Sequence, residues 1–168
     1  MLAPLARHVA LLPFERPEVF NVQHPIPEGF AELLLDGLAL RKSNELNLSS
    51  IQAYRMRLES RGLTDKLPWM VPWQQSTLLY REGRYAEAFP FIQKAYDCAQ
   101  YCAGANQYDL VNRYIELCAK NGKRKEFTKG IRWATYLGIE VRLLRKSEPT
   151  KENLEGVFDI MNRAVWPA

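Results

Sequence analysis

The chain has 168 residues, of which 47% are hydrophobic and 25% are charged, and this composition is typical of one globular domain. Such a composition argues against intrinsic disorder. The formal net charge of +4 is mild. It favours acidic partners slightly, whereas nucleic-acid modules usually concentrate their basic residues more densely. No apolar run reaches the roughly 18 residues that a membrane-spanning helix needs, so we expect no membrane partner.

The three cysteines are Cys98, Cys102 and Cys118, and an odd number in a chain of this length does not indicate a disulfide framework. Cys98 and Cys102 are spaced to share one helix face, where we expect buried apolar side chains and not metal ligands. Arg7 and His8 interrupt the apolar N-terminus, so it does not match a secretory signal. We therefore expect a reducing, cytoplasmic location.

The N-terminal residues are rich in proline, which fixes φ and removes a backbone donor. Residues 1–27 are predicted to form an extended, proline-rich arm, and residues 28–168 a single all-helical domain. The prolines of this arm are Pro4, Pro13, Pro17, Pro25 and Pro27.

Helical periodicity begins after this arm and continues to the end of the chain, and no stretch alternates with period two for long enough to be a confident strand. Ser49 and Gln52 have the spacing of a capping box, and Gly62 is a typical helix stop. Pro90 is expected to delay or bend the helix in which it lies, and residues 141–144 are ambiguous. The predicted helices are 28–41, 49–61, 72–82, 85–102, 108–121, 124–137 and about 150–165.

A pattern around Gly83 occurs again, more weakly, around Gly122, which lies 39 residues later. Glycine permits a tight turn between antiparallel helices, and the small residues Ser76 and Ala88 let their backbones approach. Because a helix pair cannot bury both of its faces alone, it needs neighbouring pairs. The first copy has Gly83, Tyr85, Ala88, Ile92 and Ala95. The second has Gly122, Phe127, Ile131 and Ala134, preceded by Val111, Ile115 and Cys118.

This pattern resembles the tetratricopeptide repeat. The resemblance implies an all-α, right-handed array of antiparallel helix pairs, at about 69–102 and 108–141, with the helix at about 150–165 as a closing cap. The second copy departs from the family, because Phe127 replaces a small residue and Arg124 replaces an aromatic one. Helices 28–41 and 49–61 are candidates for a leading pair, although they do not match the pattern.

In this family the first helix of each pair lines a concave groove that binds ligands, and the resemblance implies such a groove here. The function expected from it is a non-catalytic scaffold or adaptor that binds a peptide or protein partner, as a homo-oligomer or within a larger complex. The alternative that Trp73 and Tyr80 only pack against the preceding pair stays open. The groove residues implied are Trp73, Gln74, Thr77, Tyr80, Arg81, Asn112, Arg113, Glu116 and Lys120.

Two basic clusters favour an alternative function, which is binding of single-stranded RNA or DNA through phosphate contacts. Cations near helix C-termini also complement the helix dipole, so they have a simpler explanation. The first cluster is Lys123, Arg124 and Lys125, beside Lys120, and the second is Arg142, Arg145 and Lys146.

We find no motif for catalysis, and we expect no catalytic residue, metal or cofactor. The two histidines, His8 and His24, lie in the proline-rich arm without partners at metal-ligand spacing. No glycine-rich phosphate loop or nucleophile motif is present. Glu32 and Asp36 lie four residues apart on one helix, where a solvated face is a better interpretation than a paired-acid site.

Overall fold

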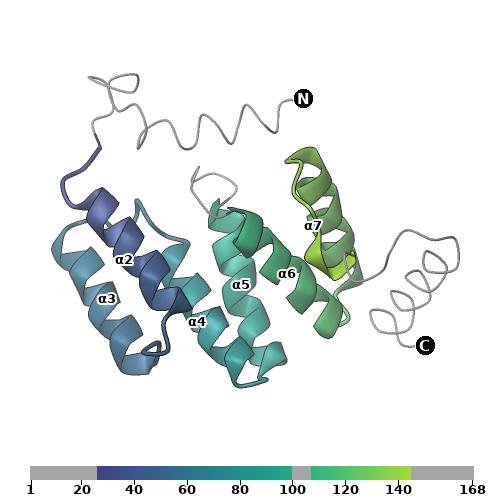
Figure 1. Ribbon diagram of the computed structural model, residues 1–168, viewed down its shortest axis with the longest axis horizontal. Coiled ribbons are helices and arrows are strands. Elements are labelled where there is room, and N and C mark those ends of the chain that lie inside the picture. The colour runs from purple at the N-terminus through teal and green to yellow at the C-terminus, as the bar shows by residue number, and fades with distance from the viewer. Residues whose placement is uncertain (1–25, 100–106, 145–168) are drawn as a thin grey trace, which may run out of the picture.

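The computed structural model describes residues 26–99 and 107–144. These residues form six α-helices and one short 3₁₀ helix (Figure 1), and no strand occurs among them, which confirms the all-α prediction for this part of the chain. The predicted arm up to residue 25 and the predicted closing helix at 150–165 lie outside the described residues. The helices are α2 Phe30–Lys42, α3 Leu48–Ser60, α4 Met70–Arg81, α5 Tyr85–Ala99, α6 Gln107–Lys120, α7 Arg124–Tyr136 and η2 Arg142–Leu144.

The predicted capping box at the start of α3 is wrong. Asn47, not Ser49, caps this helix. The Asn47 side chain accepts a hydrogen bond of 2.9 Å from the Ser50 amide, and the Ser50 hydroxyl accepts one of 2.9 Å from the Asn47 amide. This reciprocal pair satisfies two backbone donors at once. The side chains of Ile51, Tyr54 and Leu58 form the buried face of this helix.

The bounds of the helices test two further expectations, one about Pro90 and one about residues 141–144. Pro90 lies inside α5, which nevertheless begins at Tyr85, so the proline does not delay the helix start. The ambiguous residues 141–144 include the 3₁₀ helix η2, which packs on α6. The buried side chain of Val141 precedes it.

The two glycine hinges are confirmed. Gly83 and Gly122 have φ angles of 73° and 63°, in the left-handed region that favours glycine. At the first hinge the Gly83 amide donates to the Tyr80 carbonyl at 3.0 Å, and the next amide donates to the Leu79 carbonyl at 2.9 Å. The second hinge repeats this pair of hydrogen bonds. Each hinge therefore closes one helix with a Schellman motif and starts the next two residues later.

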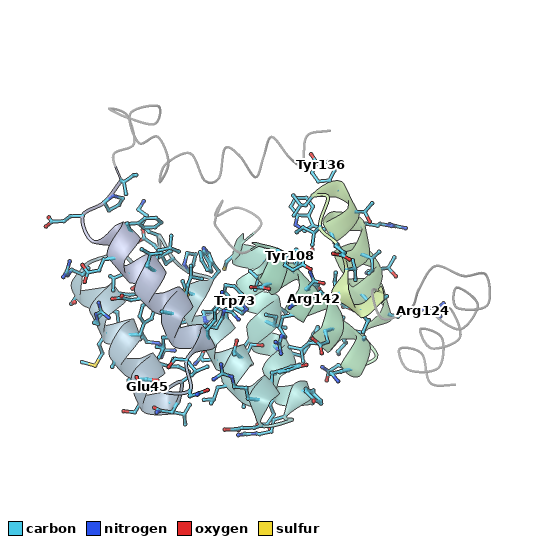
Figure 2. The ribbon with its side chains drawn as sticks, viewed as in Figure 1. Glu45, Trp73, Tyr108, Arg124, Tyr136 and Arg142 are labelled. Atoms are coloured by element: carbon cyan, nitrogen blue, oxygen red, sulfur yellow. The ribbon has the colours of Figure 1, made fainter. Side chains whose placement is uncertain are left out.

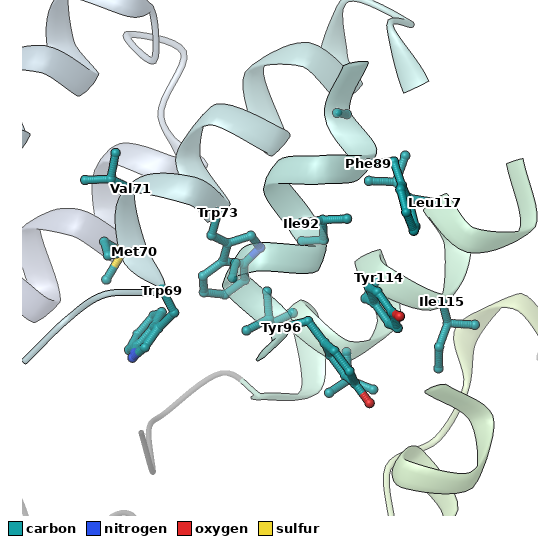
Figure 3. Close-up of a cluster of buried hydrophobic side chains, with 14 of the residues drawn as sticks. Trp69, Met70, Val71, Trp73, Phe89, Ile92, Tyr96, Tyr114, Ile115 and Leu117 are labelled. Atoms are coloured by element: carbon teal, nitrogen blue, oxygen red, sulfur yellow. The ribbon is translucent and has the colours of Figure 1, made fainter. Parts of the chain in front are cut away.

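The helices stack in sequence order along a row that runs from α2 and α3 at one end to α7 at the other (Figure 1). Helix α2 packs on both α3 and α4, and each helix from α4 onward packs on the next. The close-up in Figure 3 shows the core between them, with Trp73 and Ile92 near its centre. Ser76 and Ala88, the small residues predicted at the close approach, are fully buried, and so is Ala95 from the repeat pattern.

Gly37 is the closest approach at the start of the row. A Cβ atom at Gly37 would lie 2.5 Å from the Tyr54 hydroxyl oxygen and 2.8 Å from the Met70 Cγ. The residue therefore lets α2 meet α3 and α4 together. Helices α2, α4 and α6 end at Lys42, Arg81 and Lys120, each 39 residues after the one before, and Gly37 holds in α2 the place that Ser76 holds in α4.

We expect Gly37→Ala to destabilise the protein, by about 1–3 kcal/mol, because overpacking outweighs the roughly 1 kcal/mol that alanine gains over glycine in a helix. Urea unfolding measures the change. Gly83→Ala is the comparison for a loss of stability without a steric clash. A Cβ atom at Gly83 meets nothing within 4 Å, so only the backbone conformation is strained there. A stabilising Gly37→Ala would contradict the tight junction.

Candidate partner-binding face

The first helices of the three successive pairs, α2, α4 and α6, contribute side chains to one continuous cluster. We call it the α2/α4/α6 face. Side chains from one helix reach the next at two joints, one between α2 and α4 and one between α4 and α6. The residues of this face are Arg41, Tyr80, Arg81, Asp109, Arg113 and Glu116, with Lys120 at its edge and the buried ring of Trp73 beneath Arg41.

The joint between α4 and α6 brings together residues that the sequence assigned to different repeat copies. The Tyr80 hydroxyl donates a hydrogen bond to a carboxylate oxygen of Glu116. The Arg113 guanidinium carbon lies 3.5 Å from the centre of the Tyr80 ring. Burial, together with the bond to Glu116, raises the pKa of Tyr80 to about 12. The hydroxyl therefore stays protonated at neutral pH and serves as a donor.

Arg81 and Lys120 are exposed, and each is the last residue of its helix, α4 and α6. The two Nη atoms of Arg81 donate to the Ser43 and Arg41 carbonyls, at 2.7 and 2.9 Å. Arg81 thus caps the C-terminus of α2, where the helix dipole favours a cation. The Lys120 Nζ lies 4.4 Å from the centre of the Tyr85 ring.

Three of the expected groove residues, Trp73, Gln74 and Thr77, are buried in α4 and do not lie on the surface. Gln74 Nε2 donates to the Gly37 carbonyl at 3.1 Å, and Thr77 Oγ1 donates to the Trp73 carbonyl at 2.8 Å. The Trp69 and Trp73 rings pack with their centres 5.9 Å apart. Because α2 packs against α4, these side chains serve the joint between the pairs.

Asn112 is also buried, and it fixes the segment that follows α7. Its Nδ2 donates to the carbonyls of Tyr108 and Glu140, at 3.0 Å each. Its Oδ1 accepts a 2.7 Å hydrogen bond from the Arg142 amide. Asn112 therefore holds the backbone around η2 against α6 and is not an open groove residue.

The sequence did not single out Arg41 or Asp109, which the structure places on this face. Arg41 is only 8% exposed, and its guanidinium carbon lies 3.9 Å from the centre of the Trp73 ring. Burial lowers the pKa of Arg41, Asp109 opposes that shift, and the nearby Arg113 adds to it. Asp109 lies 3.6 Å from both Arg41 and Arg142. Trp73 and Arg142, which Arg41 and Asp109 contact, are labelled in Figure 2.

The residues of the alternative nucleic-acid site fall into separate places. Lys123, Arg124 and Lys125 are exposed together at the turn after α6. Arg142 instead lies over Tyr108 at the beginning of α6, 5.5 Å from its ring centre. Since α6 has 14 residues, these positions are about 20 Å apart. Arg145 and Lys146 lie outside the described residues.

The acidic pair Glu32 and Asp36 and the thiol of Cys118 have surroundings that do not indicate catalysis. Glu32 and Asp36 face Arg57, with oxygen–nitrogen distances of 3.4 and 2.6 Å, so they form a surface ion-pair cluster. Cys118 is buried, and burial raises the pKa of its thiol to about 12, whereas Cys98, which was expected to be buried, is only partly buried. Within residues 26–99 and 107–144, no three His, Cys, Asp or Glu side chains converge on a possible metal position. The helices of the same ranges include none with the length and apolarity to cross a bilayer.

No protein-family model matches this chain, and comparisons with curated proteins and with solved structures find no match either. The α2/α4/α6 face is therefore interpreted from its own geometry.

Proposed function

We propose that this chain is a non-catalytic scaffold or adaptor, built as a tetratricopeptide-like, right-handed array of helix pairs, which binds a peptide or protein partner on the α2/α4/α6 face. The observation that carries the proposal is the joint between α4 and α6. There Tyr80 meets Arg113 and Glu116, so that side chains from successive pairs form one surface.

The regular spacing of the helix pairs supports this proposal. The pairs are α2 with α3, α4 with α5, and α6 with α7, and their first helices end at 39-residue intervals. A constant interval is typical of repeat architectures, in which each pair buries its second face on its neighbours. The leading pair, which the sequence pattern did not match, fits the same interval.

The chemistry of the accessible side chains also supports partner binding. Arg81 and Lys120 are exposed, while Tyr80, Arg113 and Glu116 are partly exposed. Arginine and tyrosine are enriched among the residues that contribute most to protein–protein binding. Their stems and rings supply contact area, while their polar ends supply directed hydrogen bonds.

Replacing Arg113 and Lys120 with alanine together tests the proposal. We expect capture of partner proteins from an extract of the native host to fall at least about tenfold, which corresponds to about 1.4 kcal/mol. The measurement is quantitative mass spectrometry of captured proteins, with cross-links located on the chain. The matched control is Arg132→Ala with Lys129→Ala, which removes the same two charges from exposed positions of α7.

The proposal predicts cross-links to α4 and α6 that the first pair of substitutions removes and the control pair retains. Unchanged capture by the Arg113 and Lys120 variant, or cross-links confined to other helices, would contradict it.

A second candidate function is nucleic-acid binding at the turn between α6 and α7. One observation favours it, which is the close approach of cations to aromatic rings at this turn. The Lys120 Nζ lies over Tyr85, and the Lys123 Nζ lies 5.5 Å from the centre of the Phe89 ring. Cations that follow a phosphate backbone beside aromatic rings are a general feature of single-strand binding.

Charge reversal at Lys123 and Lys125 separates the two functions. If this turn binds RNA, each lost phosphate contact lowers the slope of log affinity against log salt by about 0.7. Fluorescence anisotropy with a labelled oligouridine measures the slope, and reversal at Lys66 and Lys94, both exposed elsewhere, is the control. If reversal at Lys123 and Lys125 leaves the salt slope as unchanged as the control does, RNA binding at this turn is excluded.

A further inference from the structure

Three buried N–H donors on the α2/α4/α6 face have no hydrogen-bond acceptor among the described residues. They are Arg41 Nε, Trp73 Nε1 and Arg113 Nη1. Together with Gln74 Oε1 and Ser76 Oγ, they are the buried side-chain atoms of the described ranges that lack a partner. Unpaired buried donors are unfavourable and uncommon, and two of these three belong to guanidinium groups.

Positive charge exceeds negative charge around these donors. The guanidinium groups of Arg81, Arg113 and Arg142 are close enough to lower the pKa of Arg41. The nearby carboxylate of Asp109 is shared between Arg41 and Arg142, at 3.6 Å from each, which is longer than the 2.7–2.9 Å typical of charge-assisted hydrogen bonds. The carboxylate of Glu116 accepts from Tyr80. The donors of Arg41 and Arg113 therefore remain incompletely matched by acceptors.

The two arginines are held in place before any ligand binds. Arg41 lies on the Trp73 ring at 3.9 Å, and Arg113 lies on the Tyr80 ring at 3.5 Å. Stacking on an aromatic ring fixes the plane of a guanidinium group and leaves the N–H groups on its edge free to donate. Groups that are already positioned lose less conformational entropy when an anion arrives.

We propose that the α2/α4/α6 face binds an acidic segment of its partner protein, with carboxylates of that segment accepting hydrogen bonds from the guanidinium groups of Arg41 and Arg113. This inference rests on the proposed scaffold function and adds the chemistry of the partner. Planar carboxylates match the two-pronged edge of a guanidinium group.

The charges already on this face favour a peptide over a nucleic acid. Asp109 and Glu116 lie among the arginines, and their carboxylates would repel a nucleic-acid backbone, which carries a phosphate at every nucleotide. A peptide carries its carboxylates on flexible side chains, which can turn away from Asp109 and Glu116. The cluster of adjacent exposed cations lies at the other end of α6.

Binding of fluorescein-labelled hexaglutamate to the full chain tests this inference. Hexaglutamine and a uridine hexamer are the comparison probes. We expect Arg113→Met to weaken hexaglutamate binding at least about tenfold and Arg113→Lys to weaken it less, because lysine keeps the charge but loses the planar edge. Arg132→Met, which removes one charge from an exposed position of α7, is the matched control and is expected to bind as the unchanged chain does.

A second measurement follows binding to the unchanged chain and uses a substitution only to assign a signal. In ¹H–¹⁵N NMR spectra of the unchanged chain, the indole N–H signal of Trp73 is expected to shift as hexaglutamate is added, because the centre of its ring lies 3.9 Å from the guanidinium carbon of Arg41 and the ring senses the carboxylates that arrive there. Trp73→Phe identifies the signal. The indole signal of Trp69, which lies beside Trp73 but does not contact an arginine in the described cluster, is expected to move less.

Several results would overturn the inference. Equal binding by Arg113→Met and Arg132→Met would do so, as would tighter binding of the uridine hexamer that depends on Arg113. A dimer in sedimentation experiments that Arg113→Met dissociates would assign the face to a second copy of the chain.

The outcomes also separate this inference from the scaffold proposal. A partner that cross-links to the face but is not displaced by hexaglutamate leaves the scaffold function standing and removes the acidic-segment inference. Hexaglutamate binding that depends on Arg113, without any protein captured from the host extract, supports the anion chemistry and removes the scaffold function.

Discussion

Two arginine–aromatic stacks on α4 connect the first helices of the three pairs and set which charges face outward. Arg41 from α2 covers the Trp73 ring, and Arg113 from α6 covers the Tyr80 ring, so that α4 is joined to both neighbouring first helices. A helix pair that is apolar on two faces must be covered on both. Aliphatic packing supplies most of that burial, but it does not set which side chains face outward. The stacks fix a row of oriented cations on one surface, and the proposed partner chemistry follows from that row.

The sequence predicted those features whose signals are local. Gly83 and Gly122 adopt the left-handed conformation expected of hinges, and Ser76 and Ala88 are buried, as expected at a close approach of two helices. Both kinds of prediction need only the residue and its nearest neighbours in the chain. The start of α3 was misplaced because two polar residues near it both suit a cap, and only the reciprocal hydrogen bonds between Asn47 and Ser50 decide between them.

Features that depend on packing between pairs could not be predicted in the same way. The leading pair has no glycine hinge, because Ser43, the residue that follows the end of α2 at Lys42, is extended, and the hinge pattern therefore did not identify this pair. The family resemblance implied that Trp73 and Gln74 line a groove, but a sequence pattern within one pair does not indicate that α2 covers them. Arg41 gave no sequence signal at all, since an arginine in the last turn of a helix is usually solvated. The contacts of the arm, and of the predicted helix at 150–165, lie outside the described residues.

The central claim is that α4 and α6 are coupled through their side chains into one surface. A double-mutant cycle in urea unfolding with Tyr80→Phe and Glu116→Ala tests it most directly. Residues in one hydrogen-bonded cluster usually show coupling energies of about 0.5–3 kcal/mol, whereas independent positions are additive within about 0.5 kcal/mol. We expect coupling of at least about 0.7 kcal/mol, with the double variant losing less stability than the sum of the single variants. Additive losses would contradict a continuous α2/α4/α6 face.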